Sequence, residues 1–503
     1  MKNRNMLNTV YVLNPDYHLR NDGNRVLLYS KWRTDERSTG NWLSYIHPIQ
    51  AGLLALFTYQ RTLADALFYI ARMFGSDIAD AKMRIAGWLE NKKPFYIVYH
   101  DKRIWMPSNV LVPYSGNEPF LELDPNSFMI GRKLDLTGRR LYEAPLSVTL
   151  MLTNRCRTHC RYCYADTATQ VSQPLPLGRI LQLIEEAGRL GLKQVGLIGG
   201  EVFLHPHWKE ILRKTVECGV DPEYLSTKLP FTQERIDALR RTGYRGMLQV
   251  SLDAVDAEVL KASLRVGDDY LPAVLEGLRL LDGSGLPYQV ATVLTAFNCT
   301  VAVQQALFRF LTTLKHLAHW NVVPVSDSLM ADPAEFARLK PSREEIGQVF
   351  AALGQLVCSD LPFQIHLVRD LLDARYRCTE GGSRNFEGKR CPALSSHFFI
   401  LPDGKATVCE QLYWHPHFLI GDASRQGIKE IWQSQKVKSL YGSAWKEISG
   451  ESACHDCPIA AACFSYNNRC WADIVKAYGK DKWDYPDPRC IRAGKPETPI
   501  GYV

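Results

Sequence analysis

The chain has 503 residues, of which 46% are hydrophobic, and its formal net charge at pH 7 is +7. This length predicts about three domains with sizeable cores, and the spread of the positive charge along the chain does not require nucleic-acid binding. No apolar run reaches the roughly 18 residues of a membrane span, and the N-terminus lacks the apolar region of a signal peptide. We therefore expect a cytoplasmic protein without nucleic-acid or membrane partners, whose 14 cysteines are mostly reduced metal ligands.

The N-terminal part, expected to span residues 1–115, is predicted to contain two hairpins and three helices. One hairpin turns at Asp22-Gly23, and a second turns at Asp101-Lys102. Helical periodicity lies between them, at 48–58, 63–74 and 78–89. This order is that of a winged-helix domain, whose usual partner is DNA, but the third helix begins with aspartates and has few side chains that read bases. Residues 116–145 are expected to be a linker.

Residues 146–330 alternate short apolar runs with amphipathic stretches. The apolar runs lie at 146–152, 195–198, 224–226, 247–252, 288–294 and 320–325. This alternation predicts an α/β fold in which six βα units form a parallel sheet that closes into part of a (β/α)6 barrel. Ligands of such barrels lie at the carboxyl ends of the strands. Residues 331–377 are expected to form bridging helices.

Three cysteines follow the first predicted strand in the spacing C-x3-C-x2-C: Cys156, Cys160 and Cys163. Three thiolates from one loop can hold three corners of a cubic iron-sulfur cluster and leave the fourth iron open to a chelating ligand. A zinc knot is the alternative, although such knots usually add a fourth Cys or His at short spacing. His159, inside the loop, is the candidate for that fourth ligand.

The cysteine loop, in which Tyr162 precedes the third cysteine, resembles the signature of the radical S-adenosylmethionine (radical SAM) family. Gly199, Gly200 and Glu201 follow the apolar run 195–198 and resemble the GGE motif of the same family. The resemblance implies that this motif holds the amino group of SAM. Glycines there would let the backbone pass close to a ligand at the end of a strand.

The stretch that begins at residue 247 is similar to the family's S-x-D strand followed by an arginine. Ser251 and Arg265 are therefore candidates for binding the ribose and the carboxylate of SAM. Arg265 also fits the description of a solvated charge at the end of a helix.

The C-terminal part, residues 378–503, carries a second set of cysteines. Two strands joined by an Asp403-Gly404 turn predict a hairpin that brings Cys391 and Cys409 near each other. The whole set comprises Cys378, Cys391, Cys409, Cys454, Cys457, Cys463, Cys470 and Cys490. A double zinc ribbon is one interpretation of such a set.

This part also resembles a SPASM domain, the extension of radical SAM enzymes that binds two auxiliary 4Fe-4S clusters, including its IG...IKEIW stretch at 420–432. The resemblance assigns to the first auxiliary cluster Cys391, Cys409 and Cys470. It assigns to the second Cys454, Cys457, Cys463 and Cys490. The chain departs from the family pattern because six residues, not three, separate Cys463 from Cys470. Cys378 is either the fourth ligand of the first auxiliary cluster or an ordinary loop thiol.

The N-terminal pattern resembles the PqqD-like element that precedes radical SAM enzymes acting on ribosomally made peptides. In that family the leader of a precursor peptide adds as a strand to a sheet edge and packs on a helix. The combined resemblance implies a maturase with SAM and three 4Fe-4S clusters that abstracts hydrogen from the precursor and forms a carbon-carbon or thioether cross-link. A reductant such as flavodoxin or ferredoxin would supply electrons. Glu410 would remove a proton from the substrate, or is a solvated turn residue.

Two other functions fit parts of the sequence. An anaerobic sulfatase maturase has similar chemistry, but such enzymes do not need a domain of this size before the barrel. A zinc-binding winged-helix regulator of DNA is the alternative from a different class of protein. It predicts colourless protein with bound zinc, whereas iron-sulfur clusters predict brown protein.

Overall fold

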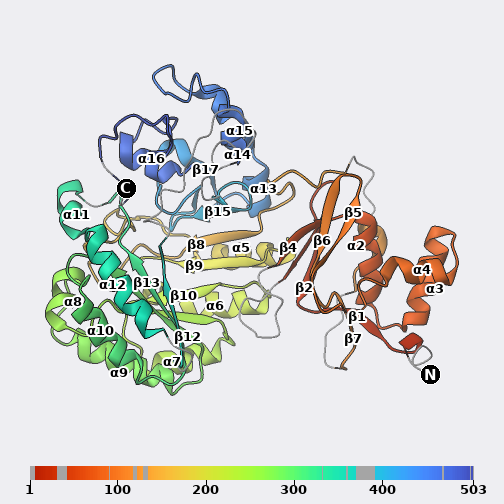
Figure 1. Ribbon diagram of the computed structural model, residues 1–503, viewed down its shortest axis with the longest axis horizontal. Coiled ribbons are helices and arrows are strands. Elements are labelled where there is room, and N and C mark those ends of the chain that lie inside the picture. The colour runs from red at the N-terminus through yellow and green to blue at the C-terminus, as the bar shows by residue number, and fades with distance from the viewer. Residues whose placement is uncertain are drawn as a thin grey trace. The chain divides into compact units, whose positions relative to one another are not determined.

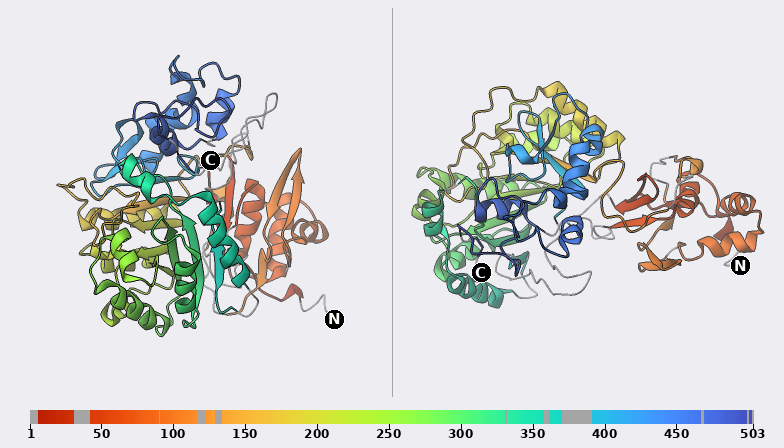
Figure 2. Two further views of the ribbon diagram at one scale, coloured as in Figure 1. Left: turned by 60° about the vertical axis from the view of Figure 1, so that its left-hand side comes forward. Right: turned by 90° about the horizontal axis from the view of Figure 1, so that it is seen from above.

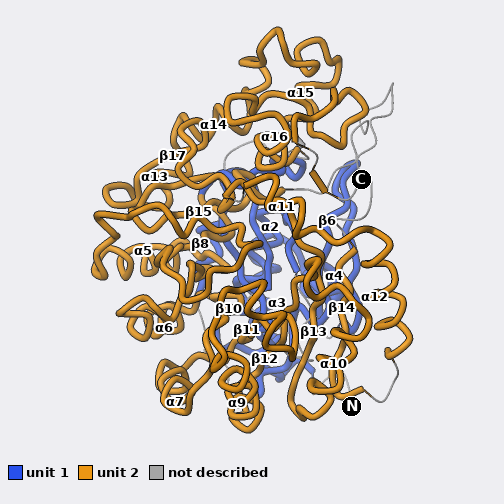
Figure 3. Tube along the Cα trace, turned by 90° about the vertical axis from the view of Figure 1, so that its left-hand side faces the viewer, with its two compact units in different colours: residues 1–143 blue, residues 144–503 orange. Residues whose placement is uncertain are grey.

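The computed structural model describes residues 6–30, 42–89, 91–116, 122–128, 134–330, 332–357, 361–369, 391–466, 469–498 and 500–501. The chain divides into two compact units, Met1–Glu143 and Ala144–Val503 (Figure 3). In these residues no helix combines the length and the apolar character that crossing a bilayer demands. Cys378 lies outside the described residues, so the structure gives no position for it.

The first unit contains the predicted hairpins and helices. Its three-stranded antiparallel sheet has the order β2 (Tyr17–Asn21), β3 (Val26–Ser30) and β4 (Leu43–Ile46). The helices are α2 (Pro48–Ala55), α3 (Leu63–Phe74) and α4 (Ile78–Ile85), and the second hairpin is β5 (Phe95–Tyr99) with β6 (Lys102–Met106). A separate pair joins β1 (Tyr11–Leu13) to β7 (Leu111–Pro113).

The aspartates that begin the third helix stabilise the helix itself. Asp77 is the N-cap of α4, and its side chain accepts a hydrogen bond of 2.8 Å from the amide of Asp80. Asp80 lies in the first turn and forms an ion pair of 2.9 Å with Arg84. Carboxylates at this end of a helix satisfy free amides and interact favourably with the helix dipole.

The end of the segment expected as a linker packs on the β2–β3 turn and belongs to the first unit. Arg25 and Asp22 form a fully buried ion pair of 2.9 Å in this turn. Arg25 donates to the carbonyl oxygens of Gly138 and Arg140, and Asp22 accepts from the amide of Tyr142. These bonds satisfy a buried charge pair with backbone groups, so residues 138–142 are held against the sheet.

The second unit contains the six predicted barrel strands. They are β8 (Ser147–Met151), β9 (Gln194–Ile198), β10 (Tyr224–Thr227), β11 (Met247–Ser251), β12 (Tyr288–Leu294) and β13 (Leu317–Pro324). The helices between them are α5 (Leu177–Arg189), α6 (Trp208–Glu217), α7 (Gln233–Arg241), α8 (Ala257–Leu264), α9 (Tyr270–Asp282) and α10 (Val301–Leu311) (Figure 1, Figure 2). Strands β10 to β13 pair in parallel order, as does β8 with β9. The two sheets adjoin at one isolated bridge between Gln194 of β9 and Asp221, which precedes β10.

The segment expected to form bridging helices also contributes a strand. After α11 (Pro333–Leu339) and α12 (Arg343–Leu356), β14 (Gln364–Leu367) pairs in parallel with β13. The sheet from β10 to β14 therefore has one strand more than the alternation predicts.

The predicted C-terminal hairpin is β15 (His397–Ile400) with β16 (Lys405–Thr407), and it joins the barrel sheet. β15 pairs in parallel with β8, which gives the order β17-β16-β15-β8-β9, where β17 is Leu419–Asp422 (Figure 1). The remaining helices of this part are α13 (Ile428–Gln433), α14 (Gln435–Gly442), α15 (Ala460–Tyr466) and α16 (Trp471–Tyr478). The hairpin thus fixes Cys409 relative to the first barrel strand, which precedes the cysteine loop.

Candidate active site

The cysteine loop lies at the carboxyl end of β8, where the barrel pattern predicts a ligand site. The sulfurs of Cys156 and Cys160 both lie 3.4 Å from the hydroxyl oxygen of Thr158. The amide of Cys163 donates to the carbonyl oxygen of Cys160 over 3.1 Å. Burial raises the pKa of the Cys160 thiol, and it raises that of Cys163 to about 11. The three thiols are half-buried, and binding of a metal would have to displace their protons.

The end of α8 holds the cysteine loop in place. The amides of His159 and Arg161 donate to the carbonyl oxygens of Leu264 and Ser263, both over 3.0 Å. These carbonyls belong to the last turn of the helix, where backbone acceptors have no partner inside the helix. The loop therefore satisfies the helix end, and the helix end fixes the loop.

Gly199 and Gly200 pack against the backbone that leads into the cysteine loop. A Cβ atom on Gly199 would lie 2.6 Å from the carbonyl oxygen of Thr153, and one on Gly200 would collide with the carbonyl oxygens of Asn154 and Arg155. The amide of Gly200 donates to the Thr153 carbonyl over 2.7 Å. These glycines are thus required by a close approach of two backbones, in addition to any approach of a ligand.

The carboxylate of Glu201 is buried and bonded to the next strand end. Its oxygens accept from the hydroxyl of Thr227 over 2.9 Å, from the amide of Lys228 over 3.1 Å and from the amide of Phe203 over 3.3 Å. Burial raises the pKa of Glu201, and these hydrogen bonds oppose that effect. In the structure Glu201 ties β9 to β10, and its expected contact with the amino group of SAM stays a prediction.

Tyr162 reaches from the cysteine loop to the end of β11. It is buried, and its hydroxyl donates to the carboxylate of Asp253. The ammonium of Lys228 lies 3.7 Å from the same carboxylate and 5.4 Å from the centre of the Tyr162 ring. Burial lowers the pKa of Lys228. Asp253 and the three thiols of the loop together raise it by more than burial lowers it, so the net shift is upward. A positive charge is therefore held beside the three thiols.

Ser251 and Arg265 occupy different surroundings. Ser251 is the last residue of β11 and is half-buried at the carboxyl edge of the sheet. Arg265 caps α8 in the left-handed conformation, with φ of 56°. Its side chain is 52% exposed and forms an ion pair of 3.4 Å with Glu335, which also pairs with Arg161. Arg265 is therefore an exposed charge at a helix end. Its side chain is linked to the cysteine loop by Glu335, which contacts both Arg265 and Arg161.

The cysteines assigned to the first auxiliary cluster interact electrostatically with one another. Cys391 and Cys409 both raise the pKa of Cys470, although burial and the neighbouring Asp473 raise it more. The amide of Cys470 donates to Asp487 over 2.9 Å. The longer spacing before Cys470 therefore does not remove it from the other two thiols.

The cysteines assigned to the second auxiliary cluster line one pocket: Cys454, Cys457, Cys463 and Cys490. Arg469 and Asp487 line the same pocket. Burial raises the pKa of Cys463 to about 12, and Arg469 opposes this effect. Within the described parts of the chain, no three His, Cys, Asp or Glu side chains are spaced to hold a single metal ion. Four thiols around one cavity instead match an iron-sulfur cluster, because its corner irons are farther apart than the ligands of a single metal ion allow.

Glu410 lies between the hairpin and the cysteine loop. Burial and, to a lesser extent, the Glu223 carboxylate raise its pKa to about 7, against the opposing effect of a hydrogen bond with Tyr164. Tyr164 directly follows Cys163, and its carbonyl oxygen accepts from the hydroxyl of Tyr413 over 3.0 Å. Glu410 is therefore a partly protonated group near neutral pH, close to the loop and next to Cys409.

An open pocket of about 680 Å³ lies between the cysteine loop and the C-terminal part. One wall is Asp166 and Thr169 of the loop, and the opposite wall is residues 411–417. His417 stacks on Trp483 with ring centres 4.0 Å apart, and Met330 is 43% exposed at the rim. The pocket thus offers aromatic and apolar surface beside the site.

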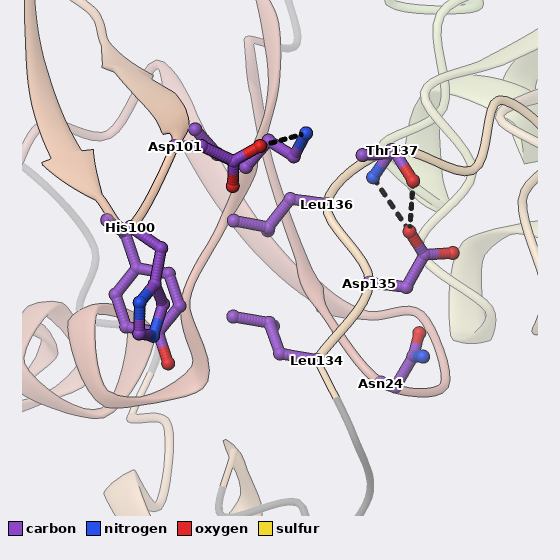
Figure 4. A pocket seen from close by; sticks show the side chains of 9 residues that line it. Asn24, His100, Asp101, Leu134, Asp135, Leu136 and Thr137 are labelled. Atoms are coloured by element: carbon purple, nitrogen blue, oxygen red, sulfur yellow. Dashed lines mark hydrogen bonds and ion pairs between the residues drawn. The ribbon is translucent and has the colours of Figure 1, made fainter.

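A second pocket of about 640 Å³ belongs to the first unit (Figure 4). It lies between the β5–β6 turn and the segment 134–137, with Asn24 at one side. Figure 4 shows that Asp101 is paired with Lys102, and that Asp135 accepts from Thr137, so the charged groups here are already bonded within the pocket.

Comparison with known proteins identifies two parts of the second unit. Residues 150–298 match the family model of the radical SAM superfamily, and residues 391–458 match that of the SPASM iron-sulfur cluster-binding domain. The chain contains a radical SAM domain and a SPASM domain. It therefore has the partial-barrel fold of that family, together with a domain that binds iron-sulfur clusters.

Several similar proteins carry names that refer to a peptide or to bacteriocin biosynthesis. PqqA peptide cyclase of Streptomyces rochei is 24% identical over 333 residues, covering 63% of this chain and 82% of the cyclase. The subtilosin biosynthesis protein AlbA of Bacillus subtilis is 24% identical over 155 residues, covering 31% of this chain and 34% of AlbA. The crystal structure of Streptococcus suis SuiB bound to its precursor peptide SuiA superposes with a TM-score of 0.62 at 13% identity, covering 95% of this chain and 98% of SuiB. The SuiB likeness extends over both units and shows a common fold.

The residues present fit an iron-sulfur cluster and SAM, and two of them, Asp253 and Lys228, were not predicted as site residues from the sequence. Asp253 and Lys228 follow β11 and β10, where a systematic search of the strand ends would have found them. Asp253 is the third residue of the S-x-D motif, and it connects Tyr162 to the amide of Val293 over 2.9 Å. Lys228 is a single charge after a short strand, and no local pattern marks it.

Proposed function

We propose that this protein is a peptide maturase that forms an oxidative carbon-carbon or thioether cross-link in a leader-bearing precursor peptide. The observation that carries the proposal is that the cysteine loop follows β8, that the hairpin ending at Cys409 pairs with the same strand in one sheet, and that four further cysteines line one pocket of the same unit. When bound, a cluster at the loop and SAM supply a 5'-deoxyadenosyl radical that abstracts hydrogen from the peptide. The relatives named for peptide modification support a peptide as the substrate.

The residues of the loop position the cofactor in this proposal. Cys156, Cys160 and Cys163 would bind three irons and leave one open for SAM, and Gly199 and Gly200 keep the loop close to β9. Glu201 and Ser251 would face the amino group and the ribose of SAM from neighbouring strand ends. Such groups are effective because a misplacement of about 1 Å can lower the rate about a hundredfold.

Three 4Fe-4S clusters would be bound in total. The two auxiliary clusters would use Cys391, Cys409 and Cys470 in one case and the four thiols around the common pocket in the other. They would accept the electron that a two-electron oxidation of the peptide releases after hydrogen abstraction. A flavodoxin or ferredoxin would supply the electron that starts each turnover.

Glu410 would take a proton from the substrate. Its pKa of about 7 suits a base at neutral pH, and its place beside Cys409 and Tyr164 puts it between the loop and the first auxiliary set. The aromatic pocket beside the loop would hold the part of the peptide that is modified, since it joins the loop to residues 411–417.

The first unit would bind the leader along β4, the outer strand of its three-stranded sheet. The amide of Ser30 donates to the carbonyl of Trp42 over 3.1 Å, so by the alternation of antiparallel pairs the amides of Leu43 and Tyr45 point away from β3. Leu43 is 43% exposed. A leader strand could pair with these outward amides. The winged-helix-like domain would then recognise the peptide by strand addition.

The central experiment is turnover by anaerobically reconstituted protein with dithionite, SAM and candidate precursor peptides from neighbouring reading frames. We expect formation of 5'-deoxyadenosine and a peptide whose mass falls by two hydrogens. Cys156→Ala is the control and should yield neither product. Protein with intact iron content that makes no deoxyadenosine would refute the radical SAM chemistry, and deoxyadenosine without any modified peptide would refute the proposed substrate.

Leader binding can be tested separately with a matched pair of proline variants. Leu43→Pro removes an outward amide from β4, and Leu19→Pro does the same on β2 at the opposite edge by the same alternation. We expect Leu43→Pro to weaken leader binding, measured by fluorescence anisotropy, while Leu19→Pro leaves it unchanged. The reverse result would place the leader on β2 and contradict the proposal.

A further inference from the structure

Two cationic side chains beside the cysteine sets have buried nitrogens with no hydrogen-bond partner among the described residues. One is Lys228, which follows β10, and the other is Arg469, which precedes Cys470. Unbonded buried cations are rare because each N–H group loses its water on burial and needs another acceptor.

The ammonium of Lys228 has no acceptor within hydrogen-bond distance in the described part of the chain. Asp253, its nearest carboxylate, lies 3.7 Å away. The same carboxylate already accepts from the Tyr162 hydroxyl and from the amide of Val293. An ammonium has three protons to donate, so this environment is incomplete without a further anion.

The anion that Lys228 lacks is expected on the side of the cysteine loop. Lys228 interacts electrostatically with Cys160, Cys163 and Cys156, in that order of strength. Three thiolates around an iron-sulfur core form an anion, and their sulfurs accept hydrogen bonds. A cluster at this loop would therefore complete the surroundings of Lys228.

Arg469 repeats this arrangement at the second auxiliary set. It is 4% exposed, and its Nε and Nη1 atoms have no partner among the described residues. Its Nη2 atom donates to the carbonyl oxygens of Tyr485 and Trp483, and its guanidinium lies 4.0 Å from the centre of the Phe464 ring. Arg469 lines the pocket that the four thiols of this set surround.

We propose that Lys228 and Arg469 are positioning charges, each of which raises the reduction potential of the cluster bound by the cysteine set that it faces. This inference rests on the proposed function. Reduction of a 4Fe-4S cluster takes one electron from a one-electron reductant and adds one negative charge to the cluster. A fixed positive charge in a low-dielectric site stabilises that added charge, so the reduced form becomes easier to reach.

The test is a redox titration of the full-length, reconstituted protein followed by electron paramagnetic resonance. Addition of SAM changes the signal of the cluster that has an open iron, and thereby identifies it. In Lys228→Met we expect the reduced-to-oxidised ratio of that cluster at a fixed potential to fall about tenfold, equivalent to 59 mV for a one-electron couple. The signals that do not respond to SAM should keep their potentials. Arg469→Met should lower the potential of one of the signals that do not respond to SAM, and it should leave the SAM-responsive cluster unchanged.

The controls distinguish the effect of a charge next to one cluster from the effect of removing any positive charge from the protein. Lys228→Arg and Arg469→Lys keep the charge and should keep the potentials close to those of wild type. Lys214→Met removes a charge from α6 that is already paired with Glu185 of α5, and it should shift none of the clusters. Equal potentials in wild type and Lys228→Met, or equal shifts of all clusters, would overturn the inference.

Two further outcomes are decisive. Loss of iron from both Lys228→Met and Lys228→Gln, with retention in Lys228→Arg at an unchanged potential, would assign Lys228 to cluster assembly and overturn the inference. Potentials that shift as expected in a protein that modifies no peptide would uphold these charges and refute the proposed substrate instead.

Discussion

Tyr162 donates its hydroxyl hydrogen to the carboxylate of Asp253, which lies at the end of a different barrel strand, 91 residues further along the chain. Both side chains are buried. The bond connects the cysteine loop after β8 to the end of β11, and Lys228 approaches the same carboxylate from the end of β10. Three strand ends that contribute to the site are therefore held together by one carboxylate.

Replacing Tyr162 by Phe should loosen the cysteine loop. The change removes one donor from a buried carboxylate, which costs about 1–3 kcal/mol of stability. We expect a lower urea midpoint of the apoprotein and less iron at the first cluster after reconstitution. Tyr288→Phe is the matched control, because its hydroxyl bonds to Asp282 over 2.6 Å away from the site. That variant should lose stability and keep its iron, and equal iron loss in both variants would contradict a specific role for Tyr162.

Gly200→Ala should displace the cysteine loop more strongly. The new Cβ atom would lie 2.6 Å from the Asn154 carbonyl and would collide with that of Arg155, and backbone atoms cannot give way as a side chain does. Such overpacking costs about 1–3 kcal/mol or more. Gly178→Ala, with no atom within 4 Å of the new Cβ, is the control. We expect iron analysis to show a loss in the first variant alone.

The alternation of apolar runs and helices predicted the six barrel strands because most of their residues are buried. It missed β14 (Gln364–Leu367), in which polar and apolar residues alternate and none is fully buried. It also missed the pairing of β15 with β8, since Ser147 and His397 are 250 residues apart and no local signal links them. Long-range strand pairing cannot be read from local periodicity.

The candidate site shows the same limit. Cys156, Cys160 and Cys163 are close in sequence, and their spacing carries the chemistry that predicts a cluster. Glu201 was predicted from its motif, but its bonds to Thr227 and Lys228 depend on which strand lies next to β9. Lys228 is a single residue, and its position beside the cysteine loop depends on how the barrel places the end of β10.

Cys457→Ala should separate SAM cleavage from peptide modification. Cys457 lines the pocket of the second auxiliary set, whereas the cysteine loop lies in another part of the unit. We expect deoxyadenosine formation to persist at a rate close to that of wild type while cross-linked peptide, measured by mass spectrometry, is lost. Cys218→Ala removes a thiol at the end of α6 and should leave both products. Full product from Cys457→Ala would refute the role proposed for the auxiliary clusters.

His397 should make the junction between the hairpin and the barrel sensitive to acid. Its ring lies 2.7 Å from the hydroxyl of Ser147 and 3.3 Å from that of Thr149, so it connects β15 to β8. Burial lowers its pKa from 6.5 to about 4, which means that the folded protein keeps it neutral where the unfolded chain binds a proton.

This depressed pKa makes His397 stabilising above pH 6.5, and that contribution is lost as the pH falls from 6.5 through 4. The loss is at most about 3 kcal/mol, because one pKa unit corresponds to about 1.4 kcal/mol. Urea unfolding between pH 7.5 and about 4.5 should therefore show a smaller decline in His397→Gln than in wild type. His316→Gln changes a side chain that is 65% exposed and should follow the wild-type decline. If His397→Gln showed the same decline as wild type, groups other than His397 would control the acid sensitivity.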